Sequence, residues 1–272
     1  MNILVLGDVF GQPGREAVKT HLPELRRELD IDIAIVNAEN AAHGFGLTEK
    51  ISGELYDAGA DVLTTGNHVW DQRELIPYID RDTRVLRPAN FPPGTPGAGT
   101  RRHELPDGRG VLVVNLMGRL FMDALDDPFR TFDAALAGHA LGRDLAAIVV
   151  DFHGEATSEK TAFGHFCDGR VSAVVGTHTH VPTADHQILP GGTAYISDLG
   201  MCGNYDSVIG LEKHASVRRF VTRMPGTKKP EPAEGEATLC GVLIVTDDAT
   251  GLARRIEPMR LGGRLATYVP TL

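Results

Sequence analysis

Short runs of β-branched and aliphatic residues, each ending in a cluster of polar residues, recur along the whole chain. Within a run the apolar residues do not alternate with polar ones, which is typical of strands covered by other layers on both faces. The runs are residues 3–6, 33–36, 62–63, 111–114, 146–150, 173–175, 193–196 and 242–245. A chain with such strands must place further layers against both faces of its sheets.

Helical patterns separate several of these runs. Apolar residues recur at helical spacing over residues 18–29. Thr48 is placed to cap a helix that closes at Gly59, and Asp71 with Glu74 resembles the capping box of a third helix. Strands that alternate with helices predict an α/β fold, and the pattern leaves the order of the strands open.

The length of 272 residues allows one large domain or two small ones. Two stretches rich in Pro, residues 87–99 and 224–236, are predicted to be irregular loops. Strand patterns of the same type lie on both sides of each stretch, so neither is typical of a linker between domains. We therefore expect a single domain over residues 1–272.

The formal net charge is −9, from 27 Lys and Arg against 36 Asp and Glu. Proteins that follow a nucleic-acid backbone need a basic stripe, and the basic clusters here are isolated pairs, so we expect no long nucleic acid as a partner. Three cysteines without a CxxC motif favour a reducing compartment. The start of the chain lacks a signal-peptide pattern, and no apolar stretch approaches the ~20 residues of a membrane span. We expect a soluble, cytoplasmic protein without a membrane partner.

Polar side chains that can bind metals follow several of the predicted strands, where ligands of α/β sheets usually bind. They are Asp8, Glu39, Asn40, Asn67, His68, His153, His178 and His180. Taken singly, such an Asp is most often a turn former and such a His a structural residue. Together they indicate a two-metal site, which can clamp both ends of a phosphoryl displacement. Mixed imidazole, carboxylate and amide donors without Cys suit Mn, Fe, Zn or Mg.

The same positions carry motifs of a known family. The motifs are GD at 7–8, NAEN at 37–40, GNH at 66–68, FHGE at 152–155 and GTHTH at 176–180. They resemble the calcineurin-like metallophosphoesterases, and GDVFGQPGR at 7–15 with ISDLGMCG at 196–203 resembles the YmdB-type family within them. The resemblance covers nearly the whole chain. It implies a four-layer α/β/β/α sandwich, a dinuclear metal centre and phosphodiesterase activity on 2′,3′-cyclic nucleotides. With the long loops, it also favours a homo-oligomer.

The resemblance also implies a role for each motif residue. Asp8 and His180 would hold one metal ion, and Glu39 would bridge to the second ion, whose other ligands would be Asn67, His153 and His178. His68 would be the proton donor, and Asn40 would bind a metal or orient the substrate. Fe or Mn is the expected metal, with Zn or Mg as alternatives; no substrate-binding residue is assigned.

Two departures from the broad superfamily concern the metal ligands. The usual Asp-x-His motif reads Asp8-Val9-Phe10 here, so the first metal would lack one imidazole. The usual bridging Asp is replaced by Glu39, a longer side chain.

Three functions remain open at this point. In the first, a metal-bound hydroxide attacks the phosphorus of a small cyclic nucleotide and His68 protonates the departing ribose oxygen. The second is a phosphomonoesterase or nucleotidase with the same centre. The third is a non-catalytic regulator that binds a nucleotide, which the full ligand set disfavours.

Overall fold

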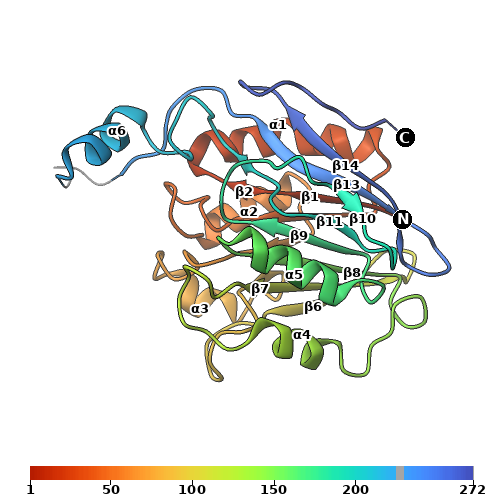
Figure 1. The fold of residues 1–272 in the computed structure, drawn as a ribbon. Helices are drawn as coiled ribbons and strands as arrows, with labels where there is room; N and C mark the ends of the chain where they lie inside the picture. The colour runs from red at the N-terminus through yellow and green to blue at the C-terminus, as the bar shows by residue number, and fades with distance from the viewer. Residues whose placement is uncertain (225–229, 272) are drawn as a thin grey trace.

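The computed structural model describes residues 1–224 and 230–271. Two six-stranded sheets lie face to face, and helices cover their outer faces (Figure 1). The predicted α/β fold with four α/β/β/α layers is therefore confirmed.

The first sheet brings the two ends of the chain together. Its order is β14-β13-β1-β3-β4-β5. The strands are β1 (Asn2–Leu6), β3 (Ile33–Asn37), β4 (Val62–Thr64), β5 (Val85–Leu86), β13 (Leu239–Thr246) and β14 (Ala253–Leu261). Strand β1 pairs in parallel with β3 and antiparallel with β13. The carboxyl ends of β1, β3 and β4 consequently point to the same edge.

The second sheet has the order β10-β11-β9-β8-β7-β6, and a small separate sheet pairs β12 with β2. The strands are β6 (Thr100–Glu104), β7 (Gly110–Met117), β8 (Ala147–His153), β9 (Ala173–Thr177), β10 (Gln187–Ile188) and β11 (Ala194–Ile196), with β2 (Asp8–Val9) and β12 (Met201–Cys202) in the small sheet. Strands β7, β8, β9 and β11 are parallel. Strand β8 continues through His153, beyond the predicted end at residue 150, because it pairs with β7 as far as Met117.

The helices are α1 (Gly11–Glu28), α2 (Glu49–Asp57), α3 (Leu75–Ile79), α4 (Pro128–Leu136), α5 (Thr157–Cys167) and α6 (Lys213–Thr222). The Thr48 hydroxyl accepts a hydrogen bond from the Ile51 amide, which confirms the predicted cap of α2. The predicted capping box of α3 is wrong, because Glu74 is the N-cap and forms no side-chain cap. Asp71 instead bonds to the ring of His68. Helix α6 projects away from the layers, at the left of Figure 1.

Three apolar cores fill the spaces between the four layers. In β1, Leu4 and Leu6 pack toward α1 and α2, whereas Ile3 and Val5 pack between the two sheets. The third core joins the outer face of the second sheet to Phe132 of α4 and to α5. Both faces of the central strands are buried, so the prediction made from their unbroken apolar runs is confirmed.

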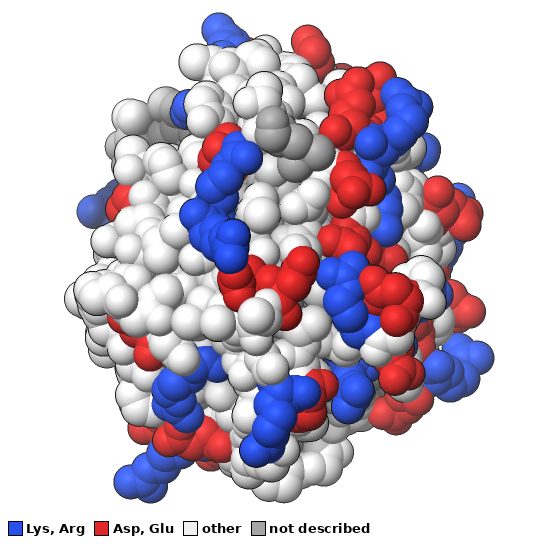
Figure 2. Space-filling view, turned by 90° about the vertical axis from the view of Figure 1, so that its right-hand side faces the viewer, with Lys and Arg blue, Asp and Glu red and all other residues white. Residues whose placement is uncertain are grey.

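The irregular loop predicted over residues 87–99 is confirmed, apart from one isolated bridge at Ala98. In the second predicted loop, residues 225–229 lie outside the described residues, and residues 230–236 form neither helix nor strand. Figure 2 shows the face at the right of Figure 1, where Lys and Arg alternate with Asp and Glu. Among the described residues, no helix is long and apolar enough to cross a membrane.

Candidate metal centre

The predicted site residues come from strand ends of both sheets and meet at their common edge. Asp8 begins β2, Glu39 follows β3, His153 ends β8, and His178 follows β9. Asp8, Glu39 and His153 are almost fully buried. The parallel strands deliver these side chains to one place because the two sheets are stacked with those edges aligned.

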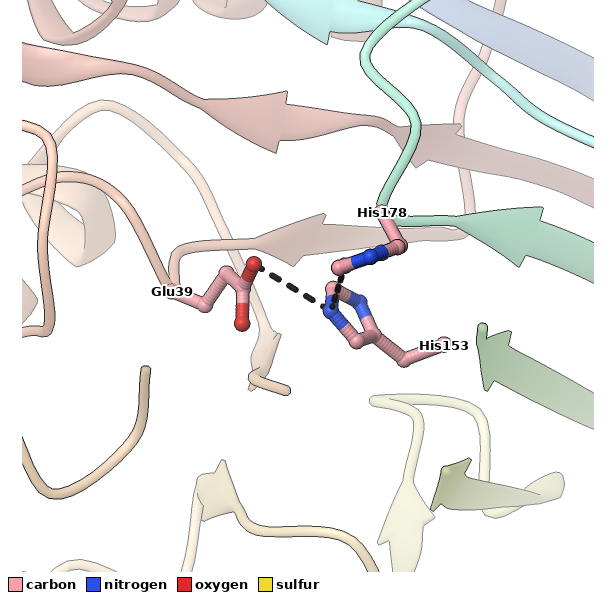
Figure 3. Close-up of side chains that lie close together, drawn as sticks. All are labelled: Glu39, His153 and His178. Atoms are coloured by element: carbon pink, nitrogen blue, oxygen red, sulfur yellow. Dashed lines mark hydrogen bonds and ion pairs between the residues drawn. The ribbon is translucent and has the colours of Figure 1, made fainter. Parts of the chain in front are cut away.

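Glu39, His153 and His178 form one group whose potential metal-binding atoms lie within 4.8 Å of one another. In Figure 3, the Glu39 carboxylate and the His178 ring both face the ring of His153. His153 Nε2 lies 3.2 Å from Glu39 Oε1 and 3.1 Å from His178 Nδ1. Asn67 Oδ1 is a third neighbour, at 3.0 Å. Three of the side chains predicted to share one metal therefore surround Nε2 of the fourth, His153.

Asp8, Glu39 and His180 form a second group of the same kind, so Glu39 belongs to both. Asp8 Oδ1 lies 4.0 Å from His180 Nε2 and 3.9 Å from His153 Nδ1. This oxygen is buried and has no hydrogen-bond partner within the described residues. A buried carboxylate oxygen without a partner is costly, and a bound cation would satisfy it.

The charges of Asp8, Glu39, His153 and His178 depend on one another. Burial raises the pKa of Asp8 to about 7, although His180 and His153 oppose the shift. Burial acts in the same direction on Glu39, but the charge of His153 and its hydrogen bond outweigh it and lower the pKa of Glu39 to about 2.

The two histidines of the first group differ in charge for the same reasons. Burial disfavours the charged form of His153, but the Glu39 carboxylate outweighs burial and raises its pKa to about 9. Burial and the charge of His153 lower the pKa of His178 to about 3. In the protein without metal, one proton on His153 thus lies among the atoms predicted to bind a cation.

Hydrogen bonds fix which nitrogen of His153 and which nitrogen of His180 faces the carboxylates. The Thr177 hydroxyl donates to Asp151 Oδ1 at 2.7 Å. That hydroxyl can therefore only accept from His153 Nδ1, at 2.9 Å, which leaves Nε2 directed at Glu39. His180 Nδ1 donates to the Ile209 carbonyl at 2.8 Å, which leaves its Nε2 toward Asp8. Such outer partners set the tautomer and orientation of metal-binding histidines.

The segment that carries His178 and His180 is held in an unusual backbone conformation. Both residues have positive φ, at 102° and 66°, which is uncommon for residues other than glycine. A buried ion pair holds the segment by hydrogen bonds to its backbone. Lys160 Nζ lies 2.8 Å from Asp198 Oδ2 and donates to the Thr177 carbonyl, and Asp198 accepts from the Thr179 amide.

Of the remaining predicted residues, His68 is partly exposed and Asn40 is buried. The His68 amide donates to Glu39 Oε2 at 3.2 Å, and its ring Nδ1 lies 2.8 Å from Asp71 Oδ2. Phe45 packs edge-on against the same ring, with centroids 5.1 Å apart. Asn40 differs from the others, since its amide donates to the Gly44 carbonyl and its buried Oδ1 has no partner among the described residues.

Gly66 lies directly against the Glu39 and His153 side chains. A Cβ atom there would lie 2.3 Å from Glu39 Oε2 and 2.3 Å from His153 Nε2. Gly66 does not have a positive φ, so close packing against the centre, rather than backbone conformation, explains the glycine.

Sequence reasoning missed several supporting residues, namely Asp71, Asp151, Lys160, Thr177 and Glu155, whose Oε2 lies 3.2 Å from His178 Nε2. Glu155 and Thr177 lie inside the recognised motifs, and Asp151 directly precedes one. Lys160 lies within α5, where no local signal separates it from a surface lysine.

Comparisons with known proteins agree with the motifs and the fold. A 2′,3′-cyclic-nucleotide 2′-phosphodiesterase of Bacillus subtilis (strain 168) is 50% identical over 257 residues, which are 94% of this chain and 96% of that protein. A hypothetical protein from Thermus thermophilus has a crystal structure with a TM-score of 0.90 and 43% identity, covering 97% of this chain and all of that one. A Mycoplasma pneumoniae phosphatase gives a TM-score of 0.87 at 35% identity, covering 96% and 93%. The YmdB-like protein family matches residues 4–259, and this chain belongs to that family.

Proposed function

We propose that the protein is a dinuclear metal-dependent phosphodiesterase that hydrolyses 2′,3′-cyclic nucleotides. The observation that carries the proposal is the position of Glu39, whose carboxylate belongs to both groups of potential metal ligands. A shared carboxylate with two oxygens is what a two-metal centre requires. The name of the Bacillus subtilis relative supports the substrate.

We assign Asp8 and His180 to one metal ion, and Asn67, His153 and His178 to the other, with Glu39 between them. Asn40 is assigned either to a metal or to the substrate, because its buried Oδ1 has no other partner among the described residues. Iron or manganese suits this set best, with zinc or magnesium as alternatives. Bound cations would neutralise charge on the phosphate oxygens and activate water.

His68 is assigned as the proton donor to the leaving oxygen. Its Nδ1 is bonded to Asp71 Oδ2, at 2.8 Å, so the ring is held in one orientation. The side chain is 30% exposed, so a substrate can reach it from the solvent. Hydrolysis of the cyclic phosphate of the substrate breaks the bond from phosphorus to the ribose 2′ oxygen. The oxygen of a water molecule bonds to the phosphorus and that water gives up one proton to the solvent, while His68 supplies the proton that the departing 2′ oxygen takes up.

A phosphomonoesterase is the second candidate, because one structural relative is described as a phosphatase. The test compares a 2′,3′-cyclic nucleotide, bis-p-nitrophenyl phosphate and p-nitrophenyl phosphate, with Mn²⁺ added. Preferred cleavage of the two diesters is expected. Preferred cleavage of the monoester would favour the second candidate, and no hydrolysis of any compound would favour a regulator.

Elemental analysis of protein purified without chelators should find close to two metal ions per chain, whereas one ion or fewer would contradict a dinuclear centre.

Three further assignments belong to the proposal. Residues 1–272 act as one domain, which the pairing of β1 with β13 in one sheet supports. The three cysteines are free, in keeping with the cytoplasm. The protein acts as a homo-oligomer without a nucleic-acid or membrane partner.

A further inference from the structure

One loop beside the metal centre presents a large aromatic side chain to the solvent. Residues 118–127 connect β7 to α4 and contain neither helix nor strand. Phe121 lies in this loop and is 90% exposed, more than any other large apolar side chain of residues 1–224 and 230–271. Its φ is 62°, a backbone conformation that is rare for a bulky residue. Backbone strain of this kind is concentrated at active sites and ligand contacts, which makes Phe121 a candidate for a contact with the substrate.

The loop begins directly beside His153. The Gly118 amide donates to the His153 carbonyl at 2.8 Å. A Cβ atom on Gly154 would lie 3.5 Å from Gly118 Cα, so the loop packs against the segment that follows His153. Three residues of chain span at most about 11 Å, which places the Phe121 backbone within roughly 15 Å of the His153 carbonyl. The ribose and base of a nucleotide can extend over such a distance from a phosphate at the metal centre.

Two buried polar side chains hold the loop in place. Glu159 of α5 accepts hydrogen bonds from two successive amides, those of Arg119 and Leu120, each at 3.0 Å. Asn90 donates to the carbonyls of residues 117 and 126, at 2.8 and 3.0 Å, and so joins the two ends of the loop. Both Glu159 and Asn90 are buried. The Phe121 ring is therefore attached to a preorganised backbone, which lowers the cost of ordering the loop around a ligand.

The phosphate and the base of a nucleotide need different partners. Metal ions held by the carboxylates and imidazoles of the centre would bind the charged phosphate. A nucleobase instead has two flat faces that stack on aromatic rings, and this contact contributes roughly 5- to 150-fold to affinity. An aromatic ring that is fixed near the centre and open to the solvent supplies a contact of this second kind.

We propose that Phe121 is the surface on which the base of the nucleotide substrate stacks. The inference rests on the proposed function, because it takes the phosphate of that substrate to lie at the metal centre. Phe121 would contact the substrate away from the reacting phosphorus and would act as a specificity-determining residue. Stacking uses a face that all nucleobases have, so we expect the protein to accept cyclic nucleotides of different bases and to bind analogues without a base more weakly.

Base stacking and structural support of the centre have different kinetic effects. The stacked base makes the same contact before and during hydrolysis, because only the bonds at phosphorus change. Loss of a contact that is equally strong in the ground state and the transition state raises KM and leaves kcat unchanged. A loop that merely supported the metal centre would instead lower kcat when it was disturbed. The two constants therefore separate these roles.

The first test measures kcat and KM, with Mn²⁺ added, for 2′,3′-cyclic AMP and for methyl riboside 2,3-cyclic phosphate, which has no base. Phe121→Ala should raise KM for 2′,3′-cyclic AMP by about 5- to 150-fold, whereas KM for the compound without a base should change much less. Phe121→Tyr keeps an aromatic ring and should have a KM close to that of the wild type. An equal change for both compounds, or a Phe121→Tyr variant as impaired as Phe121→Ala, would overturn the proposal.

The second test measures binding without turnover. Calorimetry should show that Phe121→Ala weakens the binding of adenosine 3′-phosphate by the same factor, and light scattering should show that its molar mass equals that of the wild type. Equal binding by the two proteins would overturn the proposal, and so would a changed molar mass, which would assign the ring to a contact between chains. A wild type that cleaves neither cyclic phosphate but binds adenosine 3′-phosphate through Phe121 would refute the proposed function alone.

Discussion

The substitution Gly66→Ala tests how closely the metal centre is packed. The added Cβ would lie 2.3 Å from both Glu39 Oε2 and His153 Nε2, whereas ordinary van der Waals contacts begin at 3.4 Å. The two side chains must therefore separate from the new methyl group by about 1 Å. Both belong to the group of ligands that also contains His178.

A displacement of about 1 Å in a catalytic group can cost roughly 10²-fold in rate, which corresponds to about 2.7 kcal/mol in the activation barrier. We expect kcat/KM for a 2′,3′-cyclic nucleotide to fall by at least that factor. We also expect the metal content to fall from about two ions toward one. Overpacking of this kind should lower the free energy of unfolding by about 1–3 kcal/mol, so the variant should still fold.

Gly53→Ala is the matched control. Gly53 lies in α2, and an added Cβ there meets no atom of the described residues within 4 Å. Alanine in a helix should stabilise the protein by roughly 0.5–1 kcal/mol and leave activity unchanged. Kinetics, elemental analysis and thermal unfolding should be measured on both variants. A Gly66→Ala protein with two metal ions and near-normal turnover would refute the reasoning.

Four further predictions concern individual residues of the centre. Glu39→Gln should abolish activity with the fold intact, and more than a tenth of wild-type turnover at saturating metal would contradict its shared role. His68→Ala should keep both metals and lose about 10²–10⁴-fold in turnover on a nucleotide but less on bis-p-nitrophenyl phosphate, whose leaving group needs no proton; equal losses would argue against proton donation. The pKa is about 7 for Asp8 and about 9 for His153, so each group carries a proton below its value, and metal binding should release protons and strengthen as the pH rises toward 9. Calorimetry in buffers of different ionisation enthalpy measures the proton release. A binding heat that does not depend on the buffer would contradict this prediction. Thr177→Val removes the hydroxyl that orients His153 and should weaken metal binding by about 10–100-fold, measured by competition with a chelator; unchanged affinity would show that the hydroxyl is dispensable.

Local sequence patterns were sufficient to predict the strand ends that carry the site. An unbroken apolar run followed by polar residues reports burial on both faces of a strand and the point where it ends, and both are properties of neighbouring residues. That is why Asp8, Glu39 and His178 could be recognised as candidate ligands. The family motifs then supplied the expected roles, which remain predictions.

Only the tertiary structure decided which candidates meet. Glu39 and His153 come from different sheets, and no periodicity within a strand encodes how two sheets stack. The same limit explains Asp71, whose position before α3 resembled a helix cap until the fold placed it beside the His68 ring.

The chain's own sequence thus determined its α/β class, its strand ends and the types of donor at those ends, because burial and hydrogen bonding act on each segment where it lies. Tertiary structure decided that Thr177 and Asp151 orient the His153 ring through hydrogen bonds. It also decided that α6 is exposed. Residues 151 and 177 become neighbours only because β8 and β9 pair in parallel. Helix α6 has an amphipathic pattern typical of a helix that packs one face against a core, and its exposure depends on where the chain around it is anchored.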